Sequence, residues 1–528
     1  MSVRIQKKIG SFCLAAALSA CSANEAPSPS ETGPSGRSAW ELTRAPIPDI
    51  IAALEAGEIT SEELAIAYTA RVAHGEKAVG LNAIIRLNPD LKAQAAEIDA
   101  RRAAGEDVGL LAGLPILIKD NIETADNMPT TAGSLALKDN FAVADAPLVA
   151  KLRENGALIL GKANLSEWAN FRSNRSQSGW SGVLGRTRNA YDLDRQACGS
   201  SSGSAVGTAA AMAAGAVGTE TNGSIICPSQ GNGIVGFKPT LGVVAQDGVV
   251  PIAFSQDTAG PMTRSVEGAA MMLTAMATNG AGIDYTATLS DTALEGKRIG
   301  VLRFSVSEQP GLAERFDAAL AMLEAQGAEL VEIEAFDLQV EDYGRKSMSV
   351  LVHEFKTTID AYLAATPDTV TTRSLADLIA FNEENAPREL PIFGQDIFEL
   401  SEATNGVDDP TYQQALADVK RGTGELGIDA LLADHDVDVL VSPSGPIMPV
   451  VDENGPDNWP QWSGAGYLAA VAGYPHLTVP MGQVDRVPIG LSFMSTAGKD
   501  GEVLAFGYDY EQASQMRVPP SYIEAGEN

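Results

Sequence analysis

The sequence predicts an α/β fold, and two observations support this class. Short apolar runs typical of buried strands alternate with longer amphipathic stretches typical of helices. The chain of 528 residues is 45% hydrophobic and 20% charged. This composition provides ample material for a large core, and it excludes a disordered, collagen-like or polytopic membrane chain. The alternation favours a sheet whose faces are covered by helices.

The first half of the body opens with helical signals and continues into strands. Thr60 and Glu63 fit a capping box at a helix start, and Gly156 is placed to end a later helix. Residues 203–218 are mostly Gly and Ala, which indicates a buried helix with close neighbours. In chain order, we predict a helix from Thr60, a helix at about 89–104, a strand at 114–118, a helix at 148–155, a strand at 157–160 and a helix at 203–218.

The second half contains two strand regions separated by a polar, helical segment. Leu312, Phe316 and Leu323 share one helix face, and Gly327 follows as a cap. Residues of about 338–430 show few strand signals and are interpreted as a helical insertion. The predicted strands of this half are 297–303, 328–334, 437–441, 476–480 and 489–494.

The N-terminus has the pattern of a targeting segment. Arg4, Lys7 and Lys8 precede an apolar stretch that is too short to span a bilayer, and that stretch ends in Leu18-Ser19-Ala20-Cys21, similar to a bacterial lipobox. We therefore expect a signal peptide at 1–20, a lipid-anchored flexible tether at 21–38 and a catalytic domain at 39–520. No Asp follows Cys21, so the expected location is the periplasmic side, at the outer membrane. An ordinary secreted signal peptide with an incidental Cys is the alternative.

Charge and residue content exclude several function classes. The formal charge of −31 repels nucleic-acid phosphate and anionic lipid, so we expect no nucleic-acid partner and membrane contact only through the Cys21 anchor. The four His are far apart in sequence, and no His/Cys pattern has metal-ligand spacing, so we expect no metal and no cofactor. Residues 231–236 match G-x-G-x-x-G, but Pro228 and Pro239 flank them, which argues against a dinucleotide-binding helix.

Two Ser/Gly-rich segments are the candidates for chemistry. They are 198–204 (CGSSSGS) and 218–225 (GTETNGSI), and both are embedded between apolar stretches, whereas flexible linkers are usually polar throughout. The first also matches G-x-S-x-G, which would make Ser201 a nucleophile with His476 as its base. The preceding residues are a poor strand for such an elbow, and this esterase-like site remains the alternative.

Three segments in one order resemble the amidase signature family over about residues 40–515. They are Gly113–Asp120 (GLPILIKD), Gly199–Ser204 and Gly218–Ile225. The resemblance implies the amidase signature fold, with a large twisted mixed β-sheet covered by helices on both faces. It also implies amide hydrolysis by a Ser–cis-Ser–Lys triad, in which Ser224 is the nucleophile, Ser200 the bridging serine and Lys119 the base.

The implied roles agree with elementary chemistry. Lys119 ends an apolar run that would bury it, and burial disfavours the charged amine, so that a lysine can act as a base. The resemblance implies that the backbone N–H groups of Thr221, Asn222, Gly223 and Ser224 form the oxyanion hole. We further expect Ser201 and Glu220 to support this site by hydrogen bonds.

Within the family, the chain is most similar in appearance to bacterial peptide amidases, through 198–203, 218–221 and 375–398. The expected reaction releases ammonia or an amine from a carboxamide, such as a C-terminal peptide amide. A non-catalytic lipoprotein on the same scaffold is a further alternative. Ile226 stands where many relatives carry Arg, and this, with the expected export, argues against a tRNA-dependent amidotransferase component. Cys198 and Cys227 are expected to be buried free thiols, although a bridge is left open.

Overall fold

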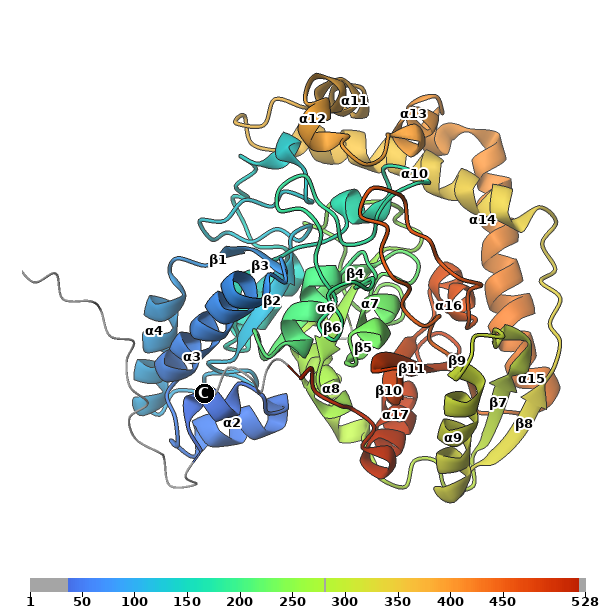
Figure 1. Cartoon of the computed structure of the whole chain (residues 1–528), viewed down its shortest axis with the longest axis horizontal. Helices are drawn as coiled ribbons and strands as arrows, with labels where there is room; N and C mark the ends of the chain where they lie inside the picture. Colours follow the sequence, from blue (N-terminus) through green and yellow to red (C-terminus); the bar gives the residue numbers. More distant parts are fainter. Residues whose placement is uncertain (1–36, 280–281, 522–528) are drawn as a thin grey trace, which may run out of the picture.

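One mixed sheet of eleven strands forms the centre of the molecule (Figure 1). The computed structural model describes residues 37–279 and 282–521. The strand order across the sheet is β1-β3-β2-β4-β6-β5-β10-β11-β9-β7-β8. The strands are β1 (Ile84–Leu87), β2 (Pro115–Lys119), β3 (Leu158–Ala163), β4 (Gly215–Glu220), β5 (Val235–Lys238), β6 (Thr258–Thr263), β7 (Arg298–Leu302), β8 (Glu329–Ile333), β9 (Val439–Pro443), β10 (His476–Val484) and β11 (Val487–Met494).

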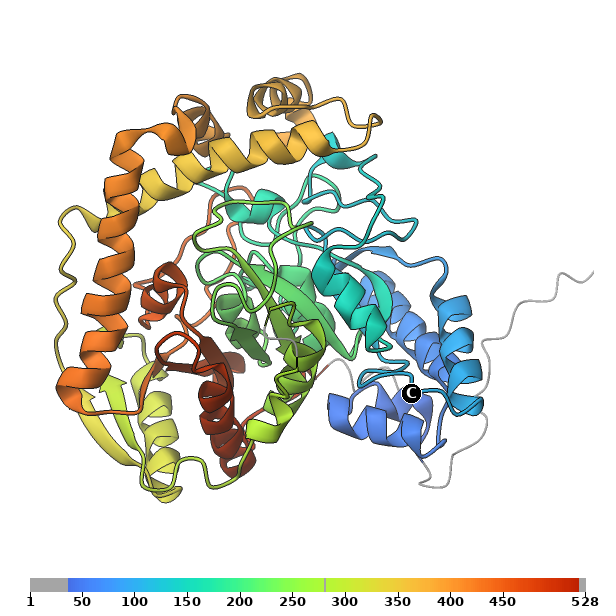
Figure 2. The ribbon, with the colours of Figure 1, turned by 180° about the vertical axis from the view of Figure 1, so that it is seen from behind.

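Helices cover both faces of this sheet. Helix α6 packs on β4 in front of the sheet in Figure 1, and α8 packs on β6 and lies in front in the reverse view of Figure 2. The helices are α1 (Ala39–Leu42), α2 (Ile47–Glu55), α3 (Ser61–His74), α4 (Leu91–Ala103), α5 (Pro147–Glu154), α6 (Ser202–Ala209), α7 (Ile226–Gly231), α8 (Val266–Met276), α9 (Leu312–Ala325), α10 (Tyr343–Ala365), α11 (Leu375–Glu384), α12 (Ala386–Glu389), α13 (Asp396–Glu402), α14 (Pro410–Thr423), α15 (Ala430–His435), α16 (Gly466–Ala472) and α17 (Asp500–Ser514). The predicted α/β class with a covered mixed sheet is confirmed.

Most predicted elements form where the sequence placed them. The capping box is present at α3, since Thr60 Oγ1 accepts from the Glu63 N–H at 3.1 Å and the Glu63 carboxylate accepts from the Thr60 N–H at 2.8 Å. Leu312, Phe316 and Leu323 are fully buried along one face of α9. The segment expected to be helical, about 338–430, consists mainly of α10 to α14 and connecting loops, with α10 to α13 at the top of Figure 1 and α14 at its right side.

The prediction of one buried helix over 203–218 was wrong. Helix α6 ends at Ala209, Ala211 adopts a φ of 56°, and the chain then enters the central strand β4. Every residue of both elements is buried, so the segment carries no polar face from which a helical or a strand period could be recognised. Strands β1, β5 and β6 were not predicted either.

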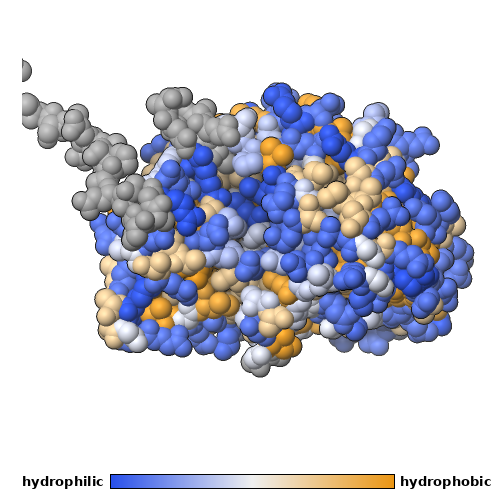
Figure 3. Space-filling model, turned by 90° about the horizontal axis from the view of Figure 1, so that it is seen from below, coloured by the Kyte–Doolittle hydropathy of each residue, from blue (hydrophilic) through white to orange (hydrophobic). Residues whose placement is uncertain are grey.

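The surface agrees with the acidic composition. The face seen from below in Figure 3 is mainly hydrophilic, with apolar residues in small scattered groups. Within the described residues, no helix has the length and apolarity needed to cross a bilayer. The expected signal peptide and Cys21 lie outside the described residues.

Candidate active site

Lys119 is the last residue of β2, the third strand from one edge of the sheet, and its side chain is completely buried. The Nζ atom lies 2.7 Å from Ser200 Oγ, 2.7 Å from Thr219 Oγ1 and 3.2 Å from the Thr219 carbonyl oxygen. Burial lowers the pKa of Lys119 to about 7, although the negative charges of Asp257 and Glu220 act in the opposite direction. A lysine in this environment is poised to take up and release a proton near neutral pH.

Ser200 follows a cis peptide bond from Gly199, in the loop before α6. Its hydroxyl contacts Lys119, and its carbonyl oxygen accepts from the Ser166 N–H at 3.0 Å. Gly203, in the first turn of α6, must be a glycine because a Cβ atom there would lie 2.2 Å from the Ala83 carbonyl oxygen. The Ser/Gly run is thus a tightly packed loop and not a flexible linker.

Ser224 lies in the turn between β4 and α7, partly exposed to a surface pocket. The backbone N–H of Ser201 donates to the Ser224 carbonyl oxygen at 3.2 Å, so the turn and the Ser200 loop are in direct contact. Gly223 has a φ of 84°, a conformation that glycine adopts without strain.

The turn leaves several backbone donors free. Among the hydrogen bonds of the described residues, none uses the N–H groups of Thr221, Asn222, Gly223 or Ser224. The four residues that carry these donors, Ser224 among them, line one pocket. Free N–H groups beside a hydroxyl are what a carbonyl oxygen needs when it acquires negative charge.

Glu220 and Ser201, which the sequence suggested as supporting residues, both hydrogen-bond to backbone groups next to the turn. Glu220 Oε2 accepts from the N–H groups of Ile225 and Ile226 at 2.8 and 3.1 Å, at the start of α7. Ser201 Oγ donates to the Thr219 carbonyl oxygen at 3.1 Å and accepts from the Thr219 N–H at 3.2 Å. Both side chains are buried, and every hydrogen bond they form within the described residues is to a backbone group, which fixes the local shape of the site; Glu220 Oε1 has no partner.

Sequence reasoning missed three residues that surround the lysine. Thr219 contacts Lys119 Nζ through two oxygens, and Asn121 Nδ2 donates to Thr219 Oγ1 at 3.0 Å. Asp257 accepts from the Thr221 hydroxyl at 2.6 Å, and burial raises the pKa of Asp257 to about 6. Had β4 been predicted beside the Lys119 strand, Thr219 could have been inferred, since β2 and β4 are parallel neighbours. Nothing in the sequence near the motifs pointed to Asp257.

The expectation of free thiols at Cys198 and Cys227 was wrong. The two residues form a disulfide with a Cα–Cα distance of 6.0 Å. The bridge connects the residue before Gly199 to the first turn of α7. Their proximity depends on how the two loops pack, and a separation of 29 residues in sequence does not reveal it.

A pocket of about 250 Å³ opens above Ser224. It is lined by Ala169, Asn170, Phe171, Ser178, Cys198, Gly199, Thr221, Asn222, Gly223, Ser224, Cys227, Ile252, Leu351, Trp459 and Trp462. The turn, the disulfide, helix α10 and the loop after β9 therefore all contribute to it. Three larger pockets lie elsewhere on the molecule, and none of them is lined by Lys119, Ser200 or Ser224.

The alternative Ser201–His476 site does not assemble. His476 lies on β10, and its Nε2 atom is 2.6 Å from Ser492 Oγ on β11. Burial lowers the pKa of His476 to about 3, so the ring is neutral. Ser201 Oγ meanwhile bonds only to Thr219. The described part of the chain contains no cluster of three or more His, Cys, Asp or Glu side chains suited to a metal ion.

The G-x-G-x-x-G match has no dinucleotide-binding geometry. Gly231 ends helix α7, and the residues that follow enter strand β5, which is the reverse of the strand–turn–helix order that such a site requires.

Comparison with known proteins places these residues in context. The sequence model of the Amidase family matches residues 63–504. A probable amidase of Arabidopsis thaliana is 34% identical over 508 residues, which cover 92% of this chain and 93% of the relative. A putative amidase of Schizosaccharomyces pombe is 34% identical over 517 residues, with 89% of this chain and 85% of the relative covered.

A solved structure gives a higher identity. The native peptide amidase of Stenotrophomonas maltophilia is 44% identical and superimposes with a TM-score of 0.86 over 91% of this chain and 99% of that one. An amidase family protein of Bacillus anthracis is 33% identical with a TM-score of 0.82, covering 91% and 94%.

Proposed function

This chain belongs to the amidase signature family and is an amidase; from that premise we propose that it hydrolyses C-terminal peptide amides or similar carboxamides through Ser224, Ser200 and Lys119. One observation carries the proposal: the buried Lys119 amine lies 2.7 Å from the Ser200 hydroxyl, and the loop that bears Ser200 contacts the turn that bears Ser224 through the Ser201 N–H. The similarity to a peptide amidase supports the substrate class.

The hydrogen bonds around Lys119 favour the proton path that this proposal needs. A neutral amine has two N–H groups and one lone pair. The Thr219 carbonyl and hydroxyl oxygens can accept the two N–H groups, which leaves the lone pair for the Ser200 hydroxyl hydrogen. Ser200 can then accept the hydroxyl proton of Ser224 as its own proton passes to Lys119.

The proposed reaction proceeds in two acyl transfers. Ser224 Oγ attacks the amide carbon while its proton moves through Ser200 to Lys119, and the free N–H groups of 221–224 stabilise the oxyanion. The proton then passes to the amide nitrogen, the C–N bond breaks, and ammonia departs. The acyl group remains bound to Ser224 as an ester. Water, activated along the same path, attacks this ester and releases the carboxylic acid and Ser224.

The test combines an active-site label with product release. We expect a fluorophosphonate probe to label the wild type and the His476→Ala variant, and to leave Ser224→Ala unlabelled. Ammonia release from peptide amides, acyl anilides and fatty amides, screened side by side, identifies the substrate class. Labelling that survives Ser224→Ala and is lost in His476→Ala would instead support the esterase-like site, and a wild type without label or turnover would support the non-catalytic alternative.

We also propose that the enzyme is exported and anchored by acyl chains on Cys21, facing the periplasm. The disulfide supports this compartment, because such bridges persist in oxidising surroundings. The lipobox-like sequence supports the anchor. Wild-type protein should fractionate with membranes and incorporate labelled fatty acid, whereas Cys21→Ser should be released into the soluble periplasmic fraction; equal fractionation of the two would contradict the anchor.

A further inference from the structure

The pocket above Ser224 contains no charged side chain among its described lining residues. This is notable in a chain with 68 acidic and 37 basic residues. Its polar groups are uncharged, such as Asn170 and Ser178, and its larger side chains are apolar. An ion entering this pocket would lose hydration without gaining a counter-charge, which is unfavourable.

Two tryptophans form the most distinctive part of the pocket wall. Trp459 and Trp462 lie on the loop that follows β9, with ring centroids 5.8 Å apart and planes inclined by 73°. Trp462 is 45% exposed, an unusual exposure for so large an apolar side chain. Phe171 and Ile252 complete the apolar part of the lining, and Leu351 of α10 joins them.

Asp457 fixes Trp459 in place. Its carboxylate accepts from the Trp459 indole N–H at 3.1 Å, from the Ser178 hydroxyl at 2.6 Å and from Gln196 Nε2 at 2.5 Å. Ser178 lines the pocket itself, so one partly buried carboxylate connects the tryptophan loop to the segment that carries Ser178.

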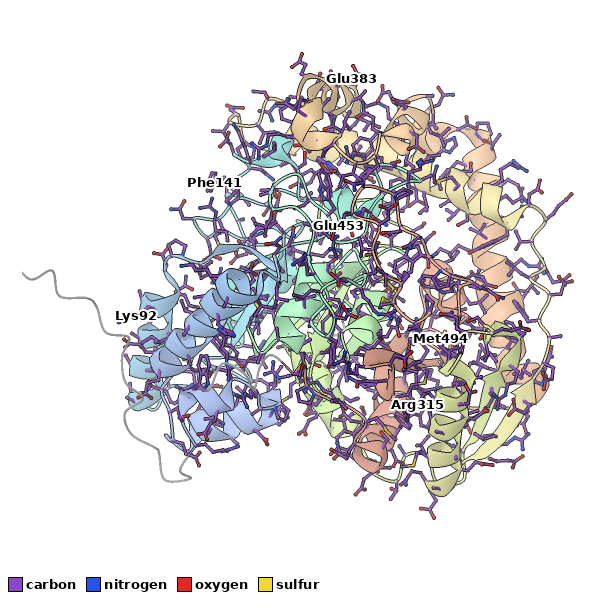
Figure 4. The ribbon with its side chains drawn as sticks, viewed as in Figure 1. Lys92, Phe141, Arg315, Glu383, Glu453 and Met494 are labelled. Atoms are coloured by element: carbon purple, nitrogen blue, oxygen red, sulfur yellow. A yellow bond between two sulfur atoms is a disulfide. The ribbon has the colours of Figure 1, made fainter. Side chains whose placement is uncertain are left out.

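Further bonds hold the rest of the loop. Gln177 Nε2 donates to the carbonyl oxygens of Asp452 and Gly455 at 2.8 and 3.1 Å, and Arg186 forms an ion pair with Glu453, which Figure 4 labels below the helices at the top. The aromatic wall is thus already positioned before any substrate binds, which reduces the entropy that binding would otherwise lose.

We propose that Trp459 and Trp462 are specificity determinants that select a bulky, uncharged and preferably aromatic side chain on the acyl part of the amide that is cleaved. This inference rests on the proposed function, because it takes Ser224 as the atom that attacks the carbonyl. Aromatic rings favour edge-to-face contacts with other rings, and the perpendicular pair offers both a face and an edge. Substrates with Lys or Glu in that position are disfavoured.

The test is a specificity ratio. N-acetyl amino acid amides with Phe, Leu, Ala, Lys and Glu side chains are compared by ammonia release, and we expect wild-type kcat/KM to favour Phe over Ala by at least about tenfold. Trp459→Ala and Trp462→Ala should each lower the Phe/Ala ratio by about tenfold, because kcat/KM for the Phe amide falls more than kcat/KM for the Ala amide. The ratio is insensitive to the fraction of folded enzyme, since both substrates are measured on one preparation.

Phe141→Ala is the matched control, because Phe141 is a comparably exposed aromatic residue, 41% accessible, that does not line the pocket and is labelled at the left of Figure 4. Its ratio should equal that of the wild type. Asp457→Asn tests the positioning role: it should lower the Phe/Ala ratio through a higher KM for the Phe amide rather than a lower kcat. Trp459→Phe, which retains a ring, should keep most of the preference that Trp459→Ala loses.

The two proposals fail in different ways. A wild type that hydrolyses these amides without preferring Phe over Ala, or tryptophan variants that keep the preference, would overturn the specificity assignment alone. A wild type that hydrolyses none of them, while the fluorophosphonate label is absent, would overturn the proposed function.

Discussion

The pH dependence of amide hydrolysis is the most direct test of Lys119 as the base. Burial lowers the pKa of Lys119 from 10.5 to about 7, and only its neutral form can accept a proton. The neutral fraction falls tenfold for each pH unit below this value, so kcat/KM at pH 5 should be about one-hundredth of its plateau and at pH 6 about one-tenth. Above pH 8 the rate should be nearly constant.

The assay uses N-acetylphenylalanine amide, which has no group that titrates between pH 5 and pH 9. Circular dichroism at each pH verifies that the enzyme stays folded, and a return to neutral pH should restore full activity. A rate that keeps rising tenfold per unit up to pH 10 would refute the reasoning, because it would indicate a solvated lysine with an ordinary pKa.

The same lowered pKa has a consequence for stability with a defined sign. The folded state binds the Lys119 proton less tightly than the unfolded state does, so folding is penalised most below pH 7, and the penalty is relieved as the pH rises toward 10.5. The full penalty corresponds to about 5 kcal/mol. Relative to Lys119→Met, the wild type should therefore gain about 2 kcal/mol between pH 7 and pH 9, measured by urea unfolding. A difference that does not change with pH would contradict the buried, desolvated state of the amine.

Three further predictions concern single features of the site and fold. Lys119→Ala should lose most of kcat while keeping the wild-type circular dichroism spectrum, and near-wild-type turnover would contradict the assigned base. Replacing Cys198 and Cys227 together by Ser should lower the unfolding free energy by about 3–4 kcal/mol, measured without reductant, because the bridge closes a long loop; an unchanged melting temperature would count against the bridge. Glu220→Ala removes the acceptor of the Ile225 and Ile226 N–H groups beside Ser224, and it should lower kcat by at least about tenfold with a smaller effect on KM. As a control, Thr60→Ala should lower the unfolding free energy by only about 1 kcal/mol and leave kcat unchanged.

Most residues of the proposed site could be named from the sequence because they are concentrated in short contiguous segments. Lys119 ends an apolar run, and such a run predicts both a buried strand and a lysine deprived of water. Ser200, Ser224 and the donors around Gly223 belong to two Ser/Gly motifs whose order resembles a known family. The α9 face and the Thr60 cap were equally local, since each depends on residues within a few turns of each other.

Contacts between distant segments were decided only by the tertiary structure. The Cys198–Cys227 bridge, the position of Asp257 beside the nucleophile turn, and the wall formed by Trp459 and Leu351 all join residues from separate elements. The α6–β4 segment was misassigned because burial on every side removes the polar pattern that separates a helix from a strand. The sequence by itself thus determined the reactive groups and their local backbone, while tertiary packing determined which distant side chains surround them, because periodicity and motif spacing encode only local geometry.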